Sequence, residues 1–371
     1  MQGLLAAMKK TDTVALDIEA DSMHHFFEKV CLIQLTIDGH NFILDPLGQV
    51  DMSGFLAELK NKTIILHDAG YDLRMMMASF GFKLEGKLFD TMLAAQLIGY
   101  ECLGLAAMLE KFFGLSISKT GQKWDWSQRP LEANKLEYAV CDTYYLTELA
   151  AILRGKLEEL GRIGWHEESC RKCVEMATQG RAEADPDKEW RIKGSRQLGN
   201  HTLTILKNIW YWRQEQAKTA DLPPYKIMNN SLMIALAGFA ADKTDKPFEK
   251  GPKLPRHCIG KRLEKLKKTI QDGQNTPKEQ WMQHPRPQYG RRPSATAQHV
   301  AEFLKDKCAE IGDELKLAPQ IIAPKAAINL IAKNRPECIK DVAECSGLMK
   351  WQSNLIMDAV KEALEVFPVR K

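Results

Sequence analysis

Two carboxylates stand two residues apart in the first strand-like stretch of the chain. Asp17 and Glu19 interrupt a pattern of apolar residues formed by Val14, Leu16 and Ile18. Side chains at positions i and i+2 of a β-strand point to the same face of the sheet. Neighbouring carboxylates that are partly buried repel each other unless a cation lies between them. The pair therefore indicates a cation site, and such a site requires further ligands.

Further acids occur in two other apolar, structured stretches. The sequence LHDAGYDLRMM (66–76) runs from a strand end into a helix and places Asp72 in its first turn. The sequence LEYAVCDTYYL (136–146) is helical, and its Tyr138 and Asp142 lie four residues apart on one face. Each stretch alone is a weak signal, because a single Asp on an apolar helix is usually a cap, a paired residue or solvent-facing. Four acids that met at one point would suit Mg²⁺ or Mn²⁺, which prefer oxygen ligands.

The first 150 residues alternate between strand-like and helix-like patterns. β-Branched and apolar residues predict strands, and Asp90 is expected to cap a helix. The predicted strands are 14–20, 30–37, 41–47 and 63–68. The predicted helices are about 71–80, 90–99, 103–113 and 132–160. These elements indicate a mixed sheet that is covered by helices.

Amphipathic helical patterns replace the strand patterns from about residue 166 onward. Segments 215–237 and 310–332 match each other at an offset of 95 residues. A duplicated small helical domain is the simplest explanation, and chance similarity between two helical regions is the alternative. A basic, Pro-rich segment, QHPRPQYGRRPS (283–294), has the composition of a linker between them. The expected fold class is α/β followed by all-α.

The charge of the chain is unevenly distributed along its 371 residues. Residues 1–150 carry 13 Lys and Arg against 20 Asp and Glu, a net charge of −7. The remaining 221 residues carry 39 against 28, a net charge of +11. An acidic front suits cations and a basic back suits a polyanion, although a solvated basic surface has the same composition.

The sequence also indicates a cellular compartment. No apolar run approaches the roughly 18–20 residues that span a bilayer, and the first residues have too short an apolar stretch for a signal peptide. The nine cysteines are scattered, and the only C-x-x-C pair, Cys170 and Cys173, has no second pair at zinc spacing. We therefore expect free thiols in a cytoplasmic protein with no membrane partner.

The order of the motifs resembles one group of nucleases. D-x-E, H-x-A-x-x-D and Y-x-x-x-D follow one another as in the DEDD exonuclease superfamily, and the tyrosine marks its DEDDy branch. The stretches KVCLIQL, ILDPL, LFDTMLAAQLIGY and DWSQRPL are similar to ribonuclease D. The bridge DKEWRIKGSRQL is also typical of that family, and WYWRQEQAKTADLPPYKIMNNSLMIALA resembles its HRDC domains. The resemblance covers nearly the whole chain.

The resemblance implies a ribonuclease H-like mixed β-sheet exonuclease domain and two small helical HRDC domains. The implied parts are a DEDDy exonuclease domain at 1–165, a helical connector at 166–194, a first HRDC domain at 195–275, a linker at 276–294 and a second HRDC-like domain at 295–367. Relatives often have an extra short strand and helix before the first motif. Only a helix-length stretch precedes it here, which leaves an edge strand in doubt but not the site.

The resemblance also implies a reaction. A metal-dependent 3′→5′ exoribonuclease would hydrolyse RNA from its 3′ end to nucleoside 5′-monophosphates, using two Mg²⁺ or Mn²⁺ ions about 3.5–4 Å apart. The implied substrates are tRNA precursors and other small structured RNAs with single-stranded 3′ ends, and we expect a monomer. A 3′→5′ DNA exonuclease and an inactive RNA-binding protein are the alternatives. The presence of all the motif residues disfavours the inactive protein.

Each motif residue then has an implied role. Asp17 would bridge both ions, and Glu19 and Asp142 would complete the site of the ion that binds the attacking water. Asp72 would serve the second ion through water molecules. Tyr138 would orient the attacking water, because a phenol with a pKa near 10 is a poor base at neutral pH.

Basic residues are candidates for phosphate contacts. Lys123 and Arg129 flank the sequence WDW (124–126), whose tryptophans could stack on a base or pack internally. The stretch 251–292 holds 11 basic and 3 acidic residues, a net charge of +8. The candidate RNA contacts in it are Lys261, Arg262, Lys265 and Lys268. A solvated face is the alternative for this stretch.

Overall fold

The chain forms two compact units in the computed structural model. The structure describes residues 1–117, 120–179, 185–242, 247–285 and 294–368. Unit 1 consists of Met1–Glu19, Val30–Gly180 and Tyr289–Lys371, and unit 2 consists of Ala20–Lys29 and Arg181–Gln288. Unit 2 therefore contains a short segment from the N-terminal part of the chain.

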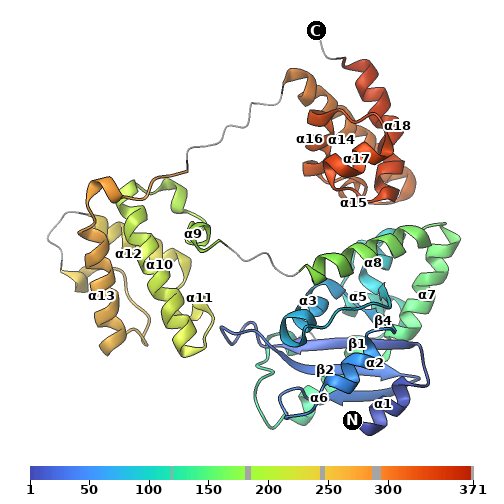
Figure 1. The fold of residues 1–371 in the computed structure, drawn as a ribbon, viewed down its shortest axis with the longest axis horizontal. Coiled ribbons are helices and arrows are strands. Elements are labelled where there is room, and N and C mark those ends of the chain that lie inside the picture. Colours follow the sequence, from blue (N-terminus) through green and yellow to red (C-terminus); the bar gives the residue numbers. More distant parts are fainter. Residues whose placement is uncertain (118–119, 180–184, 243–246, 286–293, 369–371) are drawn as a thin grey trace. The chain divides into compact units, whose positions relative to one another are not determined.

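Unit 1 contains a five-stranded mixed sheet with the strand order β3-β2-β1-β4-β5. Figure 1 labels three of its strands, β1, β2 and β4. The strands are β1 (Thr13–Ala20), β2 (Val30–Ile37), β3 (His40–Leu44), β4 (Thr63–Leu66) and β5 (Lys87–Asp90). β1 pairs with β4, and β4 with β5, in parallel, whereas β2 and β3 are antiparallel. All eight residues of β2 are buried, as expected for an apolar strand that is covered on both faces.

Helices cover this sheet. α6 packs against β2 and β3, α7 packs against β4, and α8 packs against β5 and α3. The helices of this part of unit 1 are α1 (Gln2–Met8), α2 (Ser53–Leu59), α3 (Ala69–Phe80), α4 (Thr91–Ile98), α5 (Leu105–Phe113), α6 (Ala133–Tyr144), α7 (Leu146–Glu159) and α8 (Ile163–Thr178). A 3₁₀ turn, η1 (Thr120–Lys123), precedes α6.

The observed elements differ from the sequence prediction in three places. The single helix predicted at 132–160 is wrong, because the helix is interrupted at Tyr145, where φ is −94° and ψ is −3°. The strand β5 was not predicted, because a four-residue strand is too short to show a periodic pattern. The short helix α2 was not predicted either.

Unit 2 has a helical core of its own. Its elements are α9 (Pro186–Glu189), η2 (Ser195–Gln197), α10 (Asn200–Ala220), α11 (Pro224–Ile227), α12 (Asn230–Ala241), η3 (Phe248–Lys250), α13 (Gly260–Gln274) and η4 (Lys278–Gln280). Phe26, from the N-terminal segment, packs against this core. Asp221 accepts hydrogen bonds from the backbone N–H groups of Phe26 at 3.0 Å and Phe27 at 3.2 Å. The loop between β1 and β2 is therefore anchored by helices that lie far away in the sequence.

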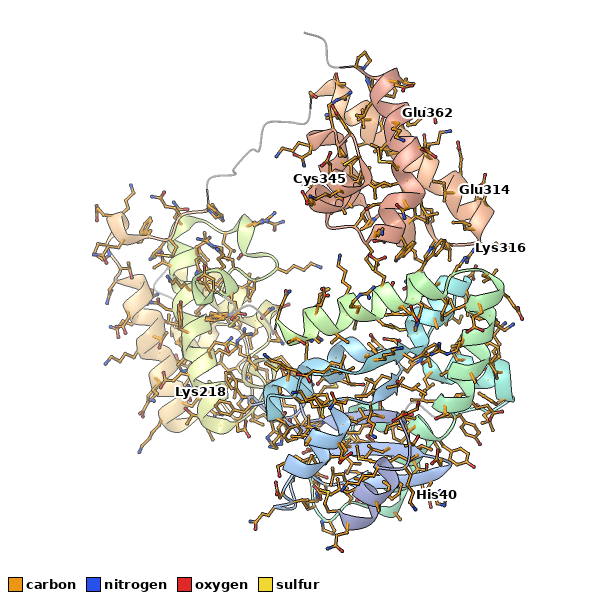
Figure 2. The ribbon with its side chains drawn as sticks, turned by 45° about the vertical axis from the view of Figure 1, so that its right-hand side comes forward. His40, Lys218, Glu314, Lys316, Cys345 and Glu362 are labelled. Carbon is orange, nitrogen blue, oxygen red and sulfur yellow. The ribbon has the colours of Figure 1, made fainter. Side chains whose placement is uncertain are left out.

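The C-terminal helices repeat the element pattern of unit 2. They are α14 (Ala295–Leu315), α15 (Pro319–Ile322), α16 (Lys325–Asn334), α17 (Ile339–Ser346) and α18 (Lys350–Val366). The bounds of α14 and α15 are those of α10 and α11 shifted by 95 residues, and α16 begins 95 residues after α12. Asp221 follows α10, and Lys316, which is labelled in Figure 2, follows α14. Both have a left-handed backbone, with φ of 47° and 56°. This agreement supports duplication over chance similarity.

The expected fold class, α/β followed by all-α, is confirmed. None of the helices in the described ranges is both long and apolar enough to cross a membrane.

Candidate metal centre

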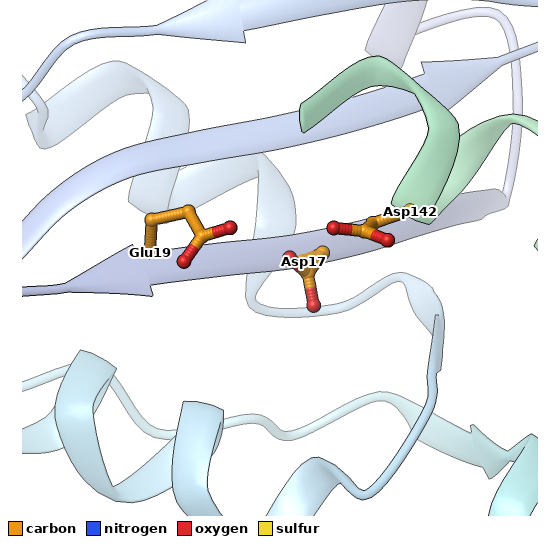
Figure 3. A group of neighbouring side chains, drawn as sticks. All are labelled: Asp17, Glu19 and Asp142. Carbon is orange, nitrogen blue, oxygen red and sulfur yellow. The ribbon is translucent and has the colours of Figure 1, made fainter. Parts of the chain in front are cut away.

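Three carboxylates meet at the middle of the sheet (Figure 3). Asp17 and Glu19 project from the same face of β1, as their spacing predicts, and Asp142 projects toward them from α6. Each residue offers one oxygen, and these oxygens all lie within 4.8 Å of one another. α6 places Asp142 there because it packs against β2, the neighbour of β1 in the sheet.

Asp72 approaches the same centre from the first turn of α3. Its side chain is buried, and its pKa is raised well above its ordinary value of 3.8. Burial is the main cause, followed by the negative charge of Asp17, and the charge of Glu19 contributes further. Asp72 lies outside the 4.8 Å group but senses the charge of two of its members.

The three clustered acids resist ionisation in the absence of a cation. Burial raises the pKa of Glu19 to about 10, with further contributions from the charges of Asp17 and Asp142. Burial raises the pKa of Asp142 to about 7, and burial together with the charge of Asp142 raises that of Asp17. A divalent cation would supply the missing positive charge, and an all-oxygen donor set suits Mg²⁺ or Mn²⁺. The residues present therefore fit the metal ions that the sequence suggests.

Tyr138 lies one helical turn before Asp142 on α6, inside an aromatic cluster. Its ring centroid is 5.6 Å from that of Trp124 and 6.1 Å from that of Trp126, which is almost fully buried. Burial, and then the charge of Asp142, raises the pKa of the Tyr138 hydroxyl. The phenol is therefore protonated at neutral pH and is able to donate a hydrogen bond.

Gly121 completes this cluster. A Cβ atom at residue 121 would lie 2.6 Å from the Tyr138 ring, so any larger residue here would displace the ring. This contact could not be predicted from the sequence, because a lone glycine in the segment TGQKW indicates a turn but not the residue that packs against it.

Arg129 is engaged by the protein itself. Its guanidinium donates to both carboxylate oxygens of Asp45 at 2.7 Å, to the carbonyl of Cys31 at 2.8 Å and to that of Trp126 at 2.7 Å. This geometry anchors the loop between η1 and α6 to the sheet. A role of Arg129 in RNA contact stays a prediction, as does that of Lys123, which ends η1.

The candidate RNA contacts in the basic stretch lie on one helix of unit 2. Lys261, Lys265 and Lys268 on α13 are exposed, and Arg262 is partly buried. Lys265 forms an exposed ion pair with Glu215 at 3.3 Å. Three further basic residues of the stretch lie outside the described residues, namely Arg286, Arg291 and Arg292.

Comparison with known proteins identifies two domains. The family model described as 3'-5' exonuclease matches residues 1–158, and the HRDC domain model matches residues 202–245. Ribonuclease D of Escherichia coli is 25% identical over 384 residues, which span 99% of this chain and 97% of that protein. The chain is therefore similar to ribonuclease D over nearly its whole length.

Two other relatives match over part of their length. Ribonuclease D of a Shewanella species is 34% identical over 245 residues, which span 64% of this chain and 61% of that protein. Ribonuclease D of Zymomonas mobilis is 29% identical over 243 residues and is likewise covered over 61% of its length. The chain thus spans about three fifths of the length of these two relatives.

Solved structures share the fold over nearly the whole chain. A protein from Bifidobacterium adolescentis has a TM-score of 0.81 at 22% identity and covers 98% of this chain and 95% of its own. The structure of E. coli RNase D, described as an exoribonuclease involved in structured RNA processing, has a TM-score of 0.69 at 23% identity. It covers 99% of this chain and 96% of its own. The combination of a mixed-sheet domain and C-terminal helices is therefore a known architecture.

Proposed function

We propose that this protein is a metal-dependent 3′→5′ exoribonuclease that releases nucleoside 5′-monophosphates from RNA 3′ ends. The observation that carries the proposal is the meeting of Asp17, Glu19 and Asp142 within 4.8 Å in a domain that matches the 3'-5' exonuclease family. Buried carboxylates with raised pKa values are typical of sites that hold cations or transfer protons.

Two Mg²⁺ or Mn²⁺ ions are the proposed cofactors. Asp17, Glu19 and Asp142 would hold one ion, and Asp72 together with Asp17 would hold the second. When bound, such ions neutralise the charge that develops on the attacking and leaving oxygens of a phosphodiester. The protein's own contribution is to hold the four carboxylates in place before substrate arrives.

Tyr138 would orient the attacking water by donating a hydrogen bond from its hydroxyl. Its raised pKa makes it a poor general base at neutral pH, because the ionised form is scarce. Trp124, Trp126 and Gly121 limit the movement of the ring, which favours a positioning role.

The substrate class rests on the charge distribution and on the family. The exposed basic residues of α13 would hold the body of a structured RNA while its single-stranded 3′ end enters the acidic site. tRNA precursors are the proposed substrates, and we infer a monomer that acts in the cytoplasm. The proposed boundaries of the exonuclease domain, the connector, the two HRDC domains and the linker are those given by the sequence.

The proposal is tested by digestion of 3′-extended tRNA precursor, single-stranded RNA and single-stranded DNA, each labelled at its 5′ end. Each reaction is run with EDTA, Mg²⁺ or Mn²⁺. We expect stepwise shortening of both RNAs from the 3′ end, with release of 5′-monophosphates, only when metal is present. Equal or faster digestion of DNA would favour the DNA exonuclease instead.

A pair of variants with the same chemical change separates catalysis from contamination. Asp17→Asn is expected to abolish digestion, because it removes a carboxylate from the cluster. Asp12→Asn, which changes an exposed acid just before β1, should digest RNA at the wild-type rate. RNA binding without digestion by the wild-type protein would support an inactive RNA-binding protein.

A further inference from the structure

The Asp90 side chain joins the starts of two helices. It accepts hydrogen bonds from the backbone N–H groups of Met92 at 2.8 Å and Leu93 at 3.1 Å, in the first turn of α4. It also accepts from the N–H groups of Asp68 at 3.3 Å and Ala69 at 2.9 Å, at the start of α3. Asp90 is only 2% exposed, so water does not compete for these bonds. One buried carboxylate therefore caps both helices.

The sheet brings the two helix starts together. β4 and β5 are parallel, and Leu66 pairs with Asp90 at their C-terminal ends. α3 follows β4 and α4 follows β5, so both helices begin at the same edge of the sheet. The sequence predicts only the cap on α4, because the link to α3 depends on this strand pairing.

α3 depends on Asp90 because it lacks a cap of its own. Asp68 occupies the N-cap position but makes no capping hydrogen bond with its side chain. Its backbone is left-handed, with φ of 65° and ψ of 55°, a conformation that non-glycine residues adopt only when neighbouring groups enforce it. The hydrogen bonds that Asp90 accepts from the N–H groups of Asp68 and Ala69 hold the backbone in this conformation.

α3 carries Asp72 within its first turn, three residues after Ala69. The direction in which a helix leaves its cap sets the position of every side chain in that turn. We propose that Asp90 is a positioning residue for Asp72: by capping α3, it sets the distance between Asp72 and the Asp17 cluster. The inference deepens the proposed function and rests on it.

α8 supports the same arrangement from outside the matched exonuclease segment. His166 on α8 donates from Nε2 to the backbone carbonyl of Asp90 at 2.9 Å, and its ring lies 4.4 Å from that of Phe89. Burial lowers the pKa of His166, so its imidazole is neutral at physiological pH. α8 thus fixes the backbone of Asp90 while the Asp90 side chain fixes α3.

The two carboxylate oxygens allow a selective test in the full-length protein. Oδ1 accepts from residues 68, 92 and 93, whereas Oδ2 accepts only from Ala69. In Asp90→Asn, an amide that keeps the three Oδ1 bonds turns its NH₂ toward the Ala69 N–H. Two donors then face each other, so the variant weakens the cap on α3 and retains the cap on α4. Asp90→Ser is a second variant, because its Oγ can cap α4 but is too short to reach α3.

Three measurements follow the effect from the cap to the metal. Hydrogen–deuterium exchange of the metal-free protein should show faster exchange of the amides of residues 68–72 and unchanged exchange in α4. Calorimetric titration with Mn²⁺ should show an affinity about 10–100-fold weaker than in the wild type. The Mn²⁺ concentration that half-saturates single-turnover RNA cleavage should rise by a similar factor, and excess Mn²⁺ should restore much of the rate.

The control removes a cap from a helix that holds no proposed metal ligand. Asn229 caps α12 by accepting from the Leu232 N–H at 2.8 Å, so Asn229→Ala should leave the Mn²⁺ affinity unchanged. Wild-type Mn²⁺ affinity in both Asp90 variants would overturn the inference, even if their exchange near α3 is faster. If the wild type neither binds Mn²⁺ nor cleaves RNA, the proposed function fails, and the exchange data then show whether Asp90 holds α3 in a protein with another role.

Discussion

Gly121 lies directly against the aromatic ring of Tyr138. A Cβ atom at residue 121 would lie 2.6–2.7 Å from three carbons of that ring, so the ring would have to move. The backbone of η1 therefore sets the position of a side chain on α6. Tyr138 lies one helical turn from Asp142, so the contact with Gly121 lies beside the proposed metal site.

Gly121→Ala is expected to slow RNA cleavage by displacing the Tyr138 ring. If Tyr138 positions the attacking water, both Gly121→Ala and Tyr138→Phe should lower the single-turnover rate, the latter by about 10²-fold. Neither variant should change the affinity for Mn²⁺, because neither alters a carboxylate. Rates are measured at saturating Mn²⁺ with enzyme in excess of single-stranded RNA.

The matched control is Gly155→Ala, within α7. A Cβ atom at residue 155 has nothing within 4 Å, so alanine fits there and should raise the stability by up to about 1 kcal/mol. Its cleavage rate should equal that of the wild type. Normal cleavage by Tyr138→Phe would remove the phenol from the mechanism and leave Gly121 with a packing role only.

Asp17→Asn should prevent metal binding and cleavage without preventing the protein from folding. The carboxylate of Asp17 has a raised pKa in the metal-free protein, because burial and the nearby Asp142 disfavour its charge. Replacing it with a neutral amide therefore removes repulsion, and the metal-free variant should be at least as stable as the wild type. Thermal unfolding in EDTA checks this point, and a large fall in melting temperature would contradict it.

The clustered acids also predict how stability depends on pH. The pKa of Asp142 is about 7 in the folded protein against an ordinary value of 3.8, so the folded state holds its proton more tightly than the unfolded state. Stability without metal should therefore rise as the pH falls from above 7 toward 4, and level off below the unfolded pKa. One pKa unit corresponds to about 1.4 kcal/mol. Urea unfolding in EDTA at several pH values measures the effect.

Metal should reverse this dependence. Mn²⁺ binds the ionised carboxylates, so binding at pH 6 should release protons, and the stabilisation by Mn²⁺ should grow as the pH rises. Calorimetry in two buffers with different ionisation enthalpies counts the released protons. Asp142→Asn removes one titrating group and should flatten the metal-free pH profile. An identical profile in that variant would contradict the assignment.

Local pattern was sufficient to predict the centre of the site. The i, i+2 spacing of Asp17 and Glu19 places them on one strand face, and the spacing of Tyr138 and Asp142 places them on one helix face. These relations hold within a single element, so the sequence contains them in full. The strand β2 was equally clear, because the stretch VCLIQLTI is rich in apolar and β-branched residues.

Contacts between distant segments were not predictable in this way. Arg129 was a candidate for a phosphate contact because of its charge and position. Its guanidinium instead pairs with Asp45, 84 residues earlier in the chain. The second helix cap made by Asp90 depends on the pairing of β4 with β5, and β5 itself is too short to be recognised. A single sequence does not specify which loop lies beside which helix.

The basic residues of α13 provide the last prediction, which concerns how RNA is held. Deleting all residues from about 195 onward would be a poor test, because Phe26 and the backbone of the β1–β2 loop are anchored by the helices of unit 2. Such a deletion would remove the helices that hold this loop. Substitution of surface charges leaves this anchor intact. The test is therefore a variant in which four residues of α13 are changed to glutamine. These residues are Lys261, Arg262, Lys265 and Lys268.

The four-residue variant should bind a tRNA precursor more weakly and with a smaller salt dependence. A phosphate contact that is lost no longer releases counterions when RNA binds. The slope of log Kd against log salt should therefore fall by up to about 0.9 per lost contact. The control makes the same change of charge at four exposed lysines of the exonuclease domain, Lys9, Lys10, Lys83 and Lys87. Cleavage of short single-stranded RNA should persist in both variants, because the metal site is untouched. Equal slopes for the two variants would show that α13 does not hold the RNA, and a structural or partner-binding role would then explain its charge better.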